Sequence, residues 1–583
     1  MLNSRFLAFV VAAAATVVWT VGAVPVRAQN KGSVALTGQV SSQEDGPMEG
    51  VLVTAKKTGS TIATTVVSDV RGRYRFPASR LEPGQYAIRI KAVGYELEGP
   101  PAAPATPTIV PVKAPSVNVD VAGQKTTTFD IKLRKANRNE VASQLSNSEW
   151  LMSFPGTDAQ KVSIQRCTHC HTYEPIVRSK HPVAEFMQVI DRMNKHTPES
   201  FPLLIQPHTQ GGRIGGGEET PEQRERAQRN EQQTAEYLAT LNLSSGPDWP
   251  YAFNIARRPT GKATQVIVTE YDLPRPINQP HDVVVDSKGM VWWASFGESV
   301  LGKMDPKTGK VTEYPVPVLK PGYVVGTLAL ELDKDDNLWL AMTFQGAISK
   351  FDQKTEKFQV FNLPPELNGD YREITFVAPQ HSSVDGKVWI NDSGSYTQLR
   401  LDIASGKWET FETSPMPHPN TYQMASDSQN NGIFTVFGRE DIGKIDAKTG
   451  KVTFYKTPTL RSGPRRGQMD SQDNFWFVEN RTNKIGVLDF KTGRFKEWTS
   501  PNPQFWPYDL APAKNGEVWA VTEYSDTVMR FNPKTSQWIE YFLPRETNQR
   551  RAFVEETTTP GTLWVGNTHK AGIVKVEPLE GSD

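Results

Sequence analysis

The sequence is poor in cysteine, and its acidic and basic side chains nearly cancel. Cys167 and Cys170 are the only cysteines in 583 residues, and 65 Lys plus Arg stand against 64 Asp plus Glu. A structural zinc site built on two cysteine pairs is therefore excluded. The balanced charge gives no basic field, so nucleic acid is not expected as a partner. After the N-terminal region, no run is apolar enough to cross a membrane.

The abundant residues indicate several β-rich domains. The chain is far too long for a single core, and its 14 Trp, 43 Gly and 43 Pro indicate many short strands joined by turns. We expect a multidomain, mainly β protein. It should contain a β-sandwich at 33–134, a small all-α domain at 140–245 and a seven-bladed β-propeller at 264–578.

Residues 1–28 have the pattern of an export signal peptide. Arg5 supplies the positive start, an apolar run extends from Phe6 to Val24, and cleavage after Ala28 would leave Gln29 first. The apolar run is also long enough to span a bilayer, so an uncleaved anchor is the alternative. Either outcome predicts a periplasmic or otherwise extracytoplasmic protein, which contacts a membrane only if the segment stays uncleaved.

The two cysteines form the motif Cys167-Thr168-His169-Cys170-His171. A Cys-x-x-Cys-His run is what c-type haem attachment requires: two thioethers to one porphyrin, with the adjacent histidine as the axial iron ligand. Cys167 and Cys170 are thus predicted to hold one covalent haem c and His171 its iron. A redox disulfide of thioredoxin type is the alternative, whereas half of a zinc site would need a second cysteine pair that the chain lacks. His169 is expected at the surface.

The residues around the motif predict helices at 141–152, 182–196 and 234–241. The last segment resembles the closing helix of small cytochrome c domains, in which an aromatic residue, here Tyr237, packs against the helix before the motif. The resemblance implies a sixth iron ligand downstream, for which Met193 is the first candidate and Met187, His181, His196 and His208 are alternatives. Histidine–methionine ligation would raise the reduction potential.

Residues 33–134 alternate apolar and polar side chains in short runs separated by turns, as a β-sandwich requires. The stretches Asp69–Phe76, Leu81–Tyr86 and Gly94–Glu96 resemble the carboxypeptidase regulatory-like (transthyretin-like) domain family. This resemblance implies a structural or docking module without catalysis.

From about residue 264 the chain repeats every 42 to 50 residues, which is typical of a propeller. One landmark is an aromatic residue in a strand, at Trp292, Trp339, Trp389, Phe434, Trp476, Trp519 and Trp564. The second is a turn followed by a strand, starting at Asp305, Asp352, Asp402, Asp446, Asp489 and Asn532. Seven aromatics but six turns leave one outer strand missing, and residues 268–274 are predicted to supply it and close the ring.

The propeller repeats, carried by Pro280–Trp293 and Phe475–Gly486, resemble the streptogramin lyase (virginiamycin B lyase) family. The resemblance implies an activity that opens a cyclic ester by elimination. It also implies a site made of two histidines, each in a Pro-His sequence that opens one of two neighbouring blades, together with a glutamate and a magnesium ion. Here the equivalent positions are His281, Leu328, Ala378, Gln423, Arg465, Tyr508 and Phe553. The histidine pair is missing, which puts the lyase activity in doubt. Glu479, at the family's glutamate position, remains a candidate catalytic residue with His281 and Arg465 at the channel mouth, and a bound Mg or Ca ion stays open.

The sequence therefore favours an exported c-type haem protein for electron transfer. In this interpretation, the propeller binds a redox partner protein, or a small molecule in its channel. A lyase with an accessory haem domain is the first alternative, and a haem-based sensor or scaffold is the second.

Overall fold

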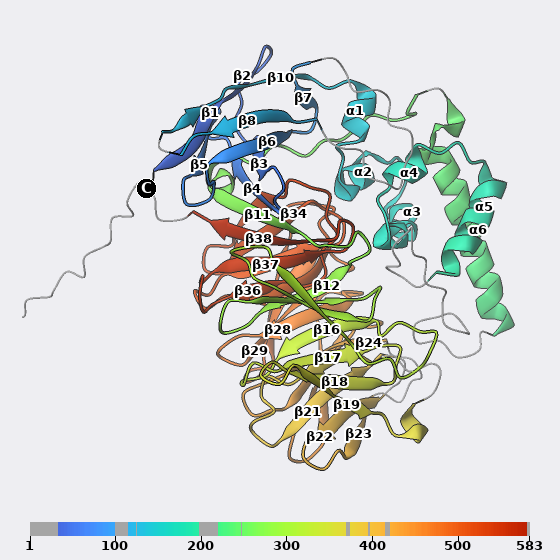
Figure 1. Ribbon diagram of the computed structural model, residues 1–583. Helices are drawn as coiled ribbons and strands as arrows, with labels where there is room; N and C mark the ends of the chain where they lie inside the picture. The colour runs from blue at the N-terminus through green and yellow to red at the C-terminus, as the bar shows by residue number, and fades with distance from the viewer. Residues whose placement is uncertain are drawn as a thin grey trace, which may run out of the picture.

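The computed structural model describes residues 33–99, 115–123, 125–196, 220–246, 248–368, 374–393, 397–413 and 420–579. The predicted signal segment and His208 lie outside these residues. Within them, no helix has both the length and the apolar character needed to span a bilayer. Figure 1 shows a β-sandwich at one end of a propeller and a group of helices beside both.

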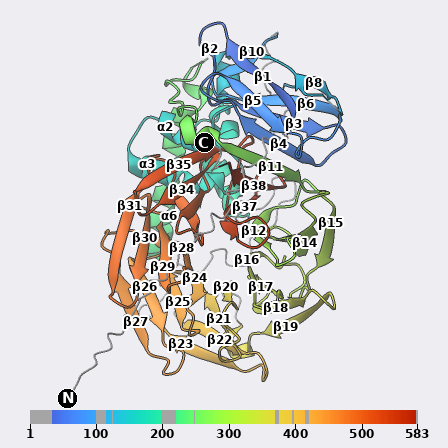
Figure 2. The same ribbon diagram turned by 90° about the vertical axis from the view of Figure 1, so that its left-hand side faces the viewer.

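Six complete four-stranded blades follow one another along the chain, each an antiparallel sheet in sequence order. The first three blades are β12 (Pro280–Val285), β13 (Val291–Ser295), β14 (Val300–Met304) and β15 (Val311–Pro315); β16 (Thr327–Leu332), β17 (Leu338–Met342), β18 (Ala347–Asp352) and β19 (Lys357–Asn362); and β20 (Ile374–Ala378), β21 (Lys387–Asp392), β22 (Thr397–Asp402) and β23 (Trp408–Glu412). The next three are β24 (Thr421–Ser426), β25 (Gly432–Val436), β26 (Asp441–Ile445) and β27 (Val452–Lys456); β28 (Pro464–Met469), β29 (Asn474–Glu479), β30 (Lys484–Asp489) and β31 (Arg494–Thr499); and β32 (Pro507–Pro512), β33 (Val518–Thr522), β34 (Thr527–Asn532) and β35 (Gln537–Phe542). Figure 2 shows the blades around a common axis, with the first strand of each nearest to it.

The seventh blade is assembled from both ends of the repeat array. Strands β36 (Phe553–Glu555), β37 (Thr562–Asn567) and β38 (Gly572–Pro578) are completed by β11 (Val266–Asp272), which pairs antiparallel with β38 over its whole length. The prediction that residues 268–274 supply the missing strand is confirmed, and so are the seven blades. This closure leaves no unpaired edge between the first and last blades.

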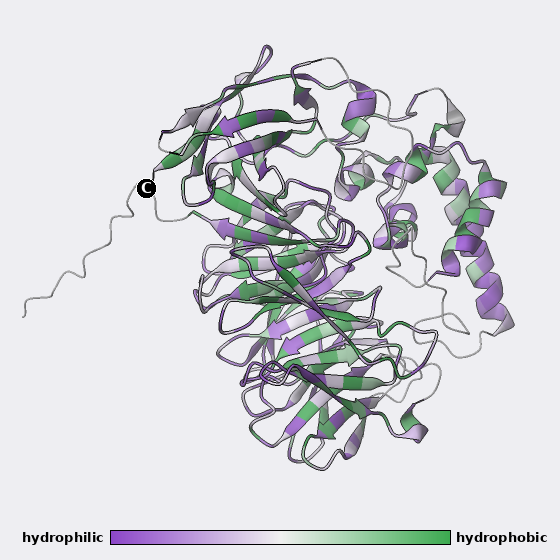
Figure 3. Cartoon of the chain, viewed as in Figure 1, coloured by the Kyte–Doolittle hydropathy of each residue, from purple (hydrophilic) through white to green (hydrophobic). Residues whose placement is uncertain are grey.

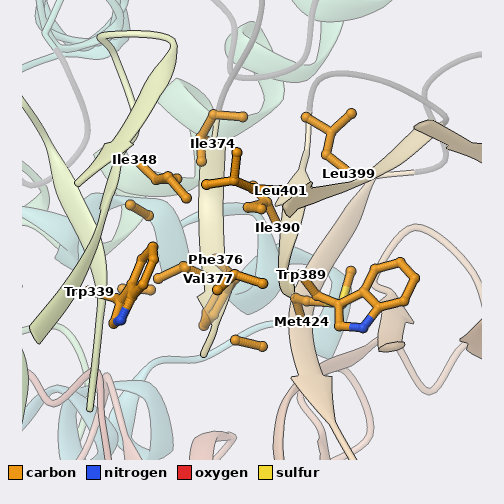
Figure 4. Close-up of a cluster of buried hydrophobic side chains, with 14 of the residues drawn as sticks. Trp339, Ile348, Ile374, Phe376, Val377, Trp389, Ile390, Leu399, Leu401 and Met424 are labelled. Carbon is orange, nitrogen blue, oxygen red and sulfur yellow. The ribbon is translucent and has the colours of Figure 1, made fainter. Parts of the chain in front are cut away.

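The landmark aromatics lie in the second strand of each blade and are buried. A buried indole needs an acceptor for its N–H, and Trp292 donates to Asp286 Oδ2 at 2.9 Å, as Trp339 does to Asp333 at 3.0 Å. Between blades the apolar side chains interdigitate, as Trp339, Phe376 and Trp389 do in Figure 4. The repeat period is therefore the spacing between the buried landmark aromatic rings of successive blades.

The N-terminal domain is β-sandwich-like. One sheet contains β1 (Val34–Ser42), β2 (Gly46–Pro47), β5 (Arg73–Pro77), β7 (Tyr95–Leu97), β9 (Thr127–Thr128) and β10 (Ile131–Lys135); the other contains β3 (Leu52–Lys57), β4 (Ile62–Val67), β6 (Gly84–Lys91) and β8 (Val117–Val121). The second sheet does not end within the domain, because β4 pairs antiparallel with β11 from Ile62–Tyr271 to Val66–Ile267. The sandwich and the seventh blade thus share one eight-stranded sheet.

The helical segment begins most of its helices with a capping box, in which a side chain caps the helix and its third residue bonds back. This holds for α1 (Arg138–Ala142), α2 (Asn147–Ser153), α3 (Asp158–Ser163) and α6 (Pro221–Leu241), whereas α4 (Glu174–Val177) and α5 (Val183–Asn194) have no side-chain cap. Short 3-10 turns are η1 (Gln165–His169), η2 (Leu243–Ser245), η3 (Gly261–Thr264) and η4 (Pro365–Leu367).

Two helix predictions were wrong in extent, and the caps explain both. The helix predicted at 141–152 is two helices, because Ser146 and Glu149 form a capping box that starts a new one. The closing helix starts at Pro221 rather than near Thr234, because Thr220 and Gln223 form a capping box there and proline suits a first turn. Its charged first turns are mostly hydrophilic in Figure 3.

The helical segment has its own aromatic core. Trp150 packs against Phe154, Trp249 and Phe253 at ring-centroid distances of 5.9, 5.6 and 5.4 Å. Tyr237 lies in the same core and donates to the Pro155 carbonyl at 2.8 Å, three residues before α3. The propeller contributes Tyr524 to this core. The helices are therefore packed against the ring and do not hang from a linker.

Candidate functional site

The cysteine motif occupies the 3-10 turn η1 and the residues just after it. Neither Cys167 nor Cys170 forms a disulfide, and both residues are partly buried. Burial raises the pKa of the Cys167 thiol to about 11. A thioredoxin-type pair has a lowered thiol pKa instead, so the environment of Cys167 does not suit redox disulfide chemistry.

His171 has one ring nitrogen fixed by the backbone. Its Nδ1 lies 2.7 Å from the Thr172 carbonyl oxygen, which can only accept, so Nδ1 carries the proton. This tautomer leaves the Nε2 lone pair for a metal, which is the arrangement that metal-ligating histidines adopt. Burial, outweighing the bond to Thr172, lowers the pKa of His171.

The propeller holds the motif by its Thr168 carbonyl. Asn548 Nδ2 donates to this oxygen at 3.0 Å and His569 Nε2 at 2.8 Å, both from loops beside the seventh blade. The amide of Ser148, at the start of α2, donates to the Tyr524 carbonyl at 2.6 Å. The site between the cysteine turn and the propeller face is therefore fixed by direct hydrogen bonds.

The three predicted channel residues differ in their access to solvent. His281, on β12, is fully buried, and its Nδ1 contacts Asp282 Oδ1 at 3.0 Å. Glu479, at the end of β29, is also fully buried and accepts from Thr482 Oγ1 at 2.9 Å. Burial and the neighbouring Glu497 raise the pKa of Glu479. Arg465, on β28, retains 13% side-chain exposure.

Three neighbouring arginines, Arg466, Arg550 and Arg551, form ion pairs inside the protein. Arg466 binds Asp282 through two hydrogen bonds of 2.9 Å, and Arg551 pairs with Glu331. Arg550 pairs with Glu523. Arg466, Arg550 and Arg551 are therefore buried side chains with carboxylate partners. These arginines face inward across the axis, where only a carboxylate can offset their desolvation.

Arg465 connects this network to the cysteine motif. Its Nη1 donates to Glu523 Oε2 at 3.0 Å, and the opposite Glu523 oxygen lies 4.0 Å from His169 Nε2. Its guanidinium lies 4.1 Å from the Tyr508 ring centroid and 4.9 Å from that of Tyr422. The two phenol oxygens are 2.5 Å apart. His169, predicted at the surface, is 28% exposed and faces the propeller.

The candidate sixth ligands lie on or beside α5. Phe186 is buried, Met187 packs against the helical core, and Met193 is 38% exposed. Among the described residues Met193 is not part of that core, unlike Phe186 and Ile190 with which it shares a face. His181 Nδ1 is engaged by Glu185 at 2.7 Å. In the described part of the chain, no three His, Cys, Asp or Glu side chains are grouped to hold a metal ion.

Three residues of this site, Asn548, His569 and Arg481, are marked by no sequence pattern. Asn548 and His569 recur in no blade position, because their partner is another domain and not the repeat. Arg481 lies in the loop after β29, and its guanidinium is 4.6 Å from the Phe437 ring centroid. The available signal was the cluster of arginines near the landmark strands. It does not indicate which of these arginines form ion pairs with carboxylates.

Residues 322–580 match the virginiamycin B lyase family model, and residues 35–134 match the carboxypeptidase regulatory-like domain. Residues 135–321 lie outside both matches. A solved streptogramin B lyase is 22% identical over 55% of this chain and 99% of its own, with a TM-score of 0.47. The virginiamycin B lyase of Staphylococcus aureus is 23% identical over 53% and 99%, with a TM-score of 0.47. No curated protein matched. The chain thus carries a carboxypeptidase regulatory-like domain followed, after the helices, by a virginiamycin B lyase-like propeller.

Proposed function

We propose that the protein is an exported electron-transfer protein in which Cys167 and Cys170 hold one haem c and His171 ligates its iron. The observation that carries the proposal is the Cys-x-x-Cys-His turn with two unbridged thiols and a histidine whose Nδ1 is bound to a backbone carbonyl. Bound haem would supply one-electron oxidation and reduction.

The residues present fit this cofactor. Both cysteines lie in or next to one short turn, and neither residue is fully buried. The Thr172 carbonyl accepts a hydrogen bond from the His171 ring and so orients it. The bonds from Asn548 and His569 to the Thr168 carbonyl fix the turn between the cysteines. Tyr173, buried two residues after the motif, donates to the Ile164 carbonyl at 3.2 Å, just before the turn. Together these contacts hold the attachment segment in one position.

Met193 is the proposed sixth ligand. It is exposed at the C-terminal end of α5, whereas Met187 is engaged in core packing. The exchange partner is proposed to be another redox protein, which requires only a modest, transient interface. The predicted export signal at 1–28 agrees with the assignment, since c-type haem is attached outside the cytoplasm.

Haem attachment is tested by expressing the full chain in a periplasm with a working haem-attachment system. A denaturing gel stained for haem peroxidase activity should show a band at the protein's mass. The variant carrying Cys167→Ala and Cys170→Ala should give equal protein and no stain. An unstained wild-type band would refute the proposal. The sixth ligand is tested by comparing the reduced spectra of the wild-type and Met193→Ala proteins, because only the wild-type spectrum should show methionine ligation.

A lyase is the second candidate, favoured by the family match over 322–580 and by Glu479. Burial and Glu497 raise the pKa of this carboxyl to about 8, so it can exchange a proton in the neutral to mildly alkaline range. His281 offers no support, because its Nδ1 is engaged by Asp282 inside the protein. Ring opening of a streptogramin B with added magnesium tests this candidate, with Glu479→Gln as the inactive control. No turnover by the wild-type protein would exclude it.

A further inference from the structure

The arginines of the propeller face divide into those with a carboxylate of their own and those without. Arg466 has Asp282, Arg551 has Glu331 and Arg550 has Glu523. Arg465 shares Glu523 with Arg550, so one carboxylate serves two guanidinium groups. Arg481 has no ion pair with any described carboxylate. Arg465 and Arg481 therefore carry the positive charge that this face does not neutralise.

These two arginines converge on one aromatic ring. The Arg481 and Arg465 guanidinium carbons lie 4.6 and 5.3 Å from the Phe437 centroid. Two like charges beside one ring repel, and burial together with Arg465 lowers the pKa of Arg481. Such an arrangement is stabilised when an anion lies between the two guanidinium groups.

The same place has an unused hydrogen-bond donor. Arg465 Nε is buried and has no acceptor among the described residues. An unsatisfied buried donor is destabilising, and a ligand oxygen that accepts from it would remove that cost. The paired hydroxyls of Tyr422 and Tyr508 lie beside the same guanidinium. Arg481 is exposed, so a ligand can reach the pair from solvent.

We propose that Arg465 and Arg481, flanking Phe437, bind a carboxylate group on the propeller face that holds the cysteine motif. The two guanidinium groups bind the carboxylate oxygens, and the rings of Phe437 and Tyr422 accommodate an apolar or aromatic body. The carboxylate could belong to a free organic acid or to a propionate of the haem itself. The second source rests on the proposed function, because it needs haem at Cys167 and Cys170. The link between the two sites is Glu523, which contacts Arg465 at 3.0 Å and lies 4.0 Å from His169.

Calorimetric titration of the full chain with benzoate at low salt tests the site. It is run on the wild-type protein and on the Cys167→Ala, Cys170→Ala variant. Binding to both forms identifies a site for a free acid. Binding to the cysteine variant alone, with the wild type carrying haem, identifies a propionate as the native occupant. Absence of binding in both forms overturns the proposal.

Arg481→Gln should weaken benzoate binding at least tenfold, because it removes one of two charges on the carboxylate. Arg439→Gln is the matched control: it is 44% exposed, lies two residues from Phe437 and pairs with Asp441. Equal affinities of the Arg481→Gln and Arg439→Gln proteins would also overturn the proposal. A colourless protein that still binds benzoate would refute the haem function and leave this site intact.

Discussion

Asp282 forms ion pairs with two arginines at the centre of the propeller. Removing its charge therefore tests how much these ion pairs contribute to the stability of the propeller. Asp282 is fully buried and accepts two hydrogen bonds of 2.9 Å from Arg466, one of 3.4 Å from Arg551 and one of 3.3 Å from the Leu330 amide. Asp282→Asn keeps the shape and removes the charge. The variant leaves the buried Arg466 with the carboxylate of Asp509 alone, whose Oδ2 lies 3.7 Å from Arg466 Nε.

Removing one partner of a buried ion pair costs about 3–5 kcal/mol. At the roughly 2 °C per kcal/mol typical of larger domains, the propeller transition should fall by about 6–10 °C in scanning calorimetry. Asp335→Asn is the control, since it removes the same charge from an exposed pair with Lys334 and should cost below about 1 kcal/mol. A transition in Asp282→Asn as high as in Asp335→Asn would refute this account of the core.

The effect should also depend on pH. Burial favours the protonated acid, but Arg466, His281 and Arg551 outweigh it and hold the pKa of Asp282 below its usual range. A carboxyl with a lower pKa in the folded state contributes its stability above the unfolded pKa of about 3.9 and loses it as pH falls further. The difference in transition temperature between wild type and Asp282→Asn should therefore be constant above about pH 5 and shrink below about pH 4.

Three further variants test the separate cores of the domains and the contacts between them. The double variant Cys167→Ala, Cys170→Ala should keep the calorimetric transition of the propeller within about 2 °C, because the ring has its own core; a lost transition would contradict separate cores. Thr269→Pro should give aggregated protein on gel filtration, because Thr269 lies in β11, which pairs with both β38 and β4; a folded monomer would show that this strand is dispensable. His569→Ala should speed hydrogen exchange at 165–171 about five-fold, by loss of a bond worth about 1 kcal/mol to Thr168, whereas His381→Ala, whose partner is Ser426, should not.

The propeller was predictable because its information is local and repeated. Each blade carries one buried indole or phenyl ring, and the Asp305 turn shows why the second landmark recurs: the Lys307 amide donates to the Asp305 side chain and Gly309 adopts a φ of +70°. The count of seven aromatics against six turns was sufficient to find the closing strand. Strand pairing between different domains has no such period, so the sequence did not predict that β4 pairs with β11.

The candidate site was predictable only in its chemistry. The spacing of Cys167, Cys170 and His171 names a cofactor without any structure. Which arginines are free to bind a ligand depends on pairs such as Arg551 with Glu331, separated by 220 residues. The clamp on Thr168 likewise joins side chains about 380 and 401 residues away. Contacts of this kind leave no pattern in a single sequence.

The central claim is that Cys167 and Cys170 carry a haem that His171 ligates through the nitrogen left free by Thr172. An optical spectrum of the purified, periplasmically expressed full-length protein, oxidised and reduced, tests it most directly. The account predicts a red protein whose reduced spectrum is that of a c-type haem and whose colour stays with the polypeptide after acid–acetone extraction. A colourless protein, or a haem that extraction removes, would contradict it.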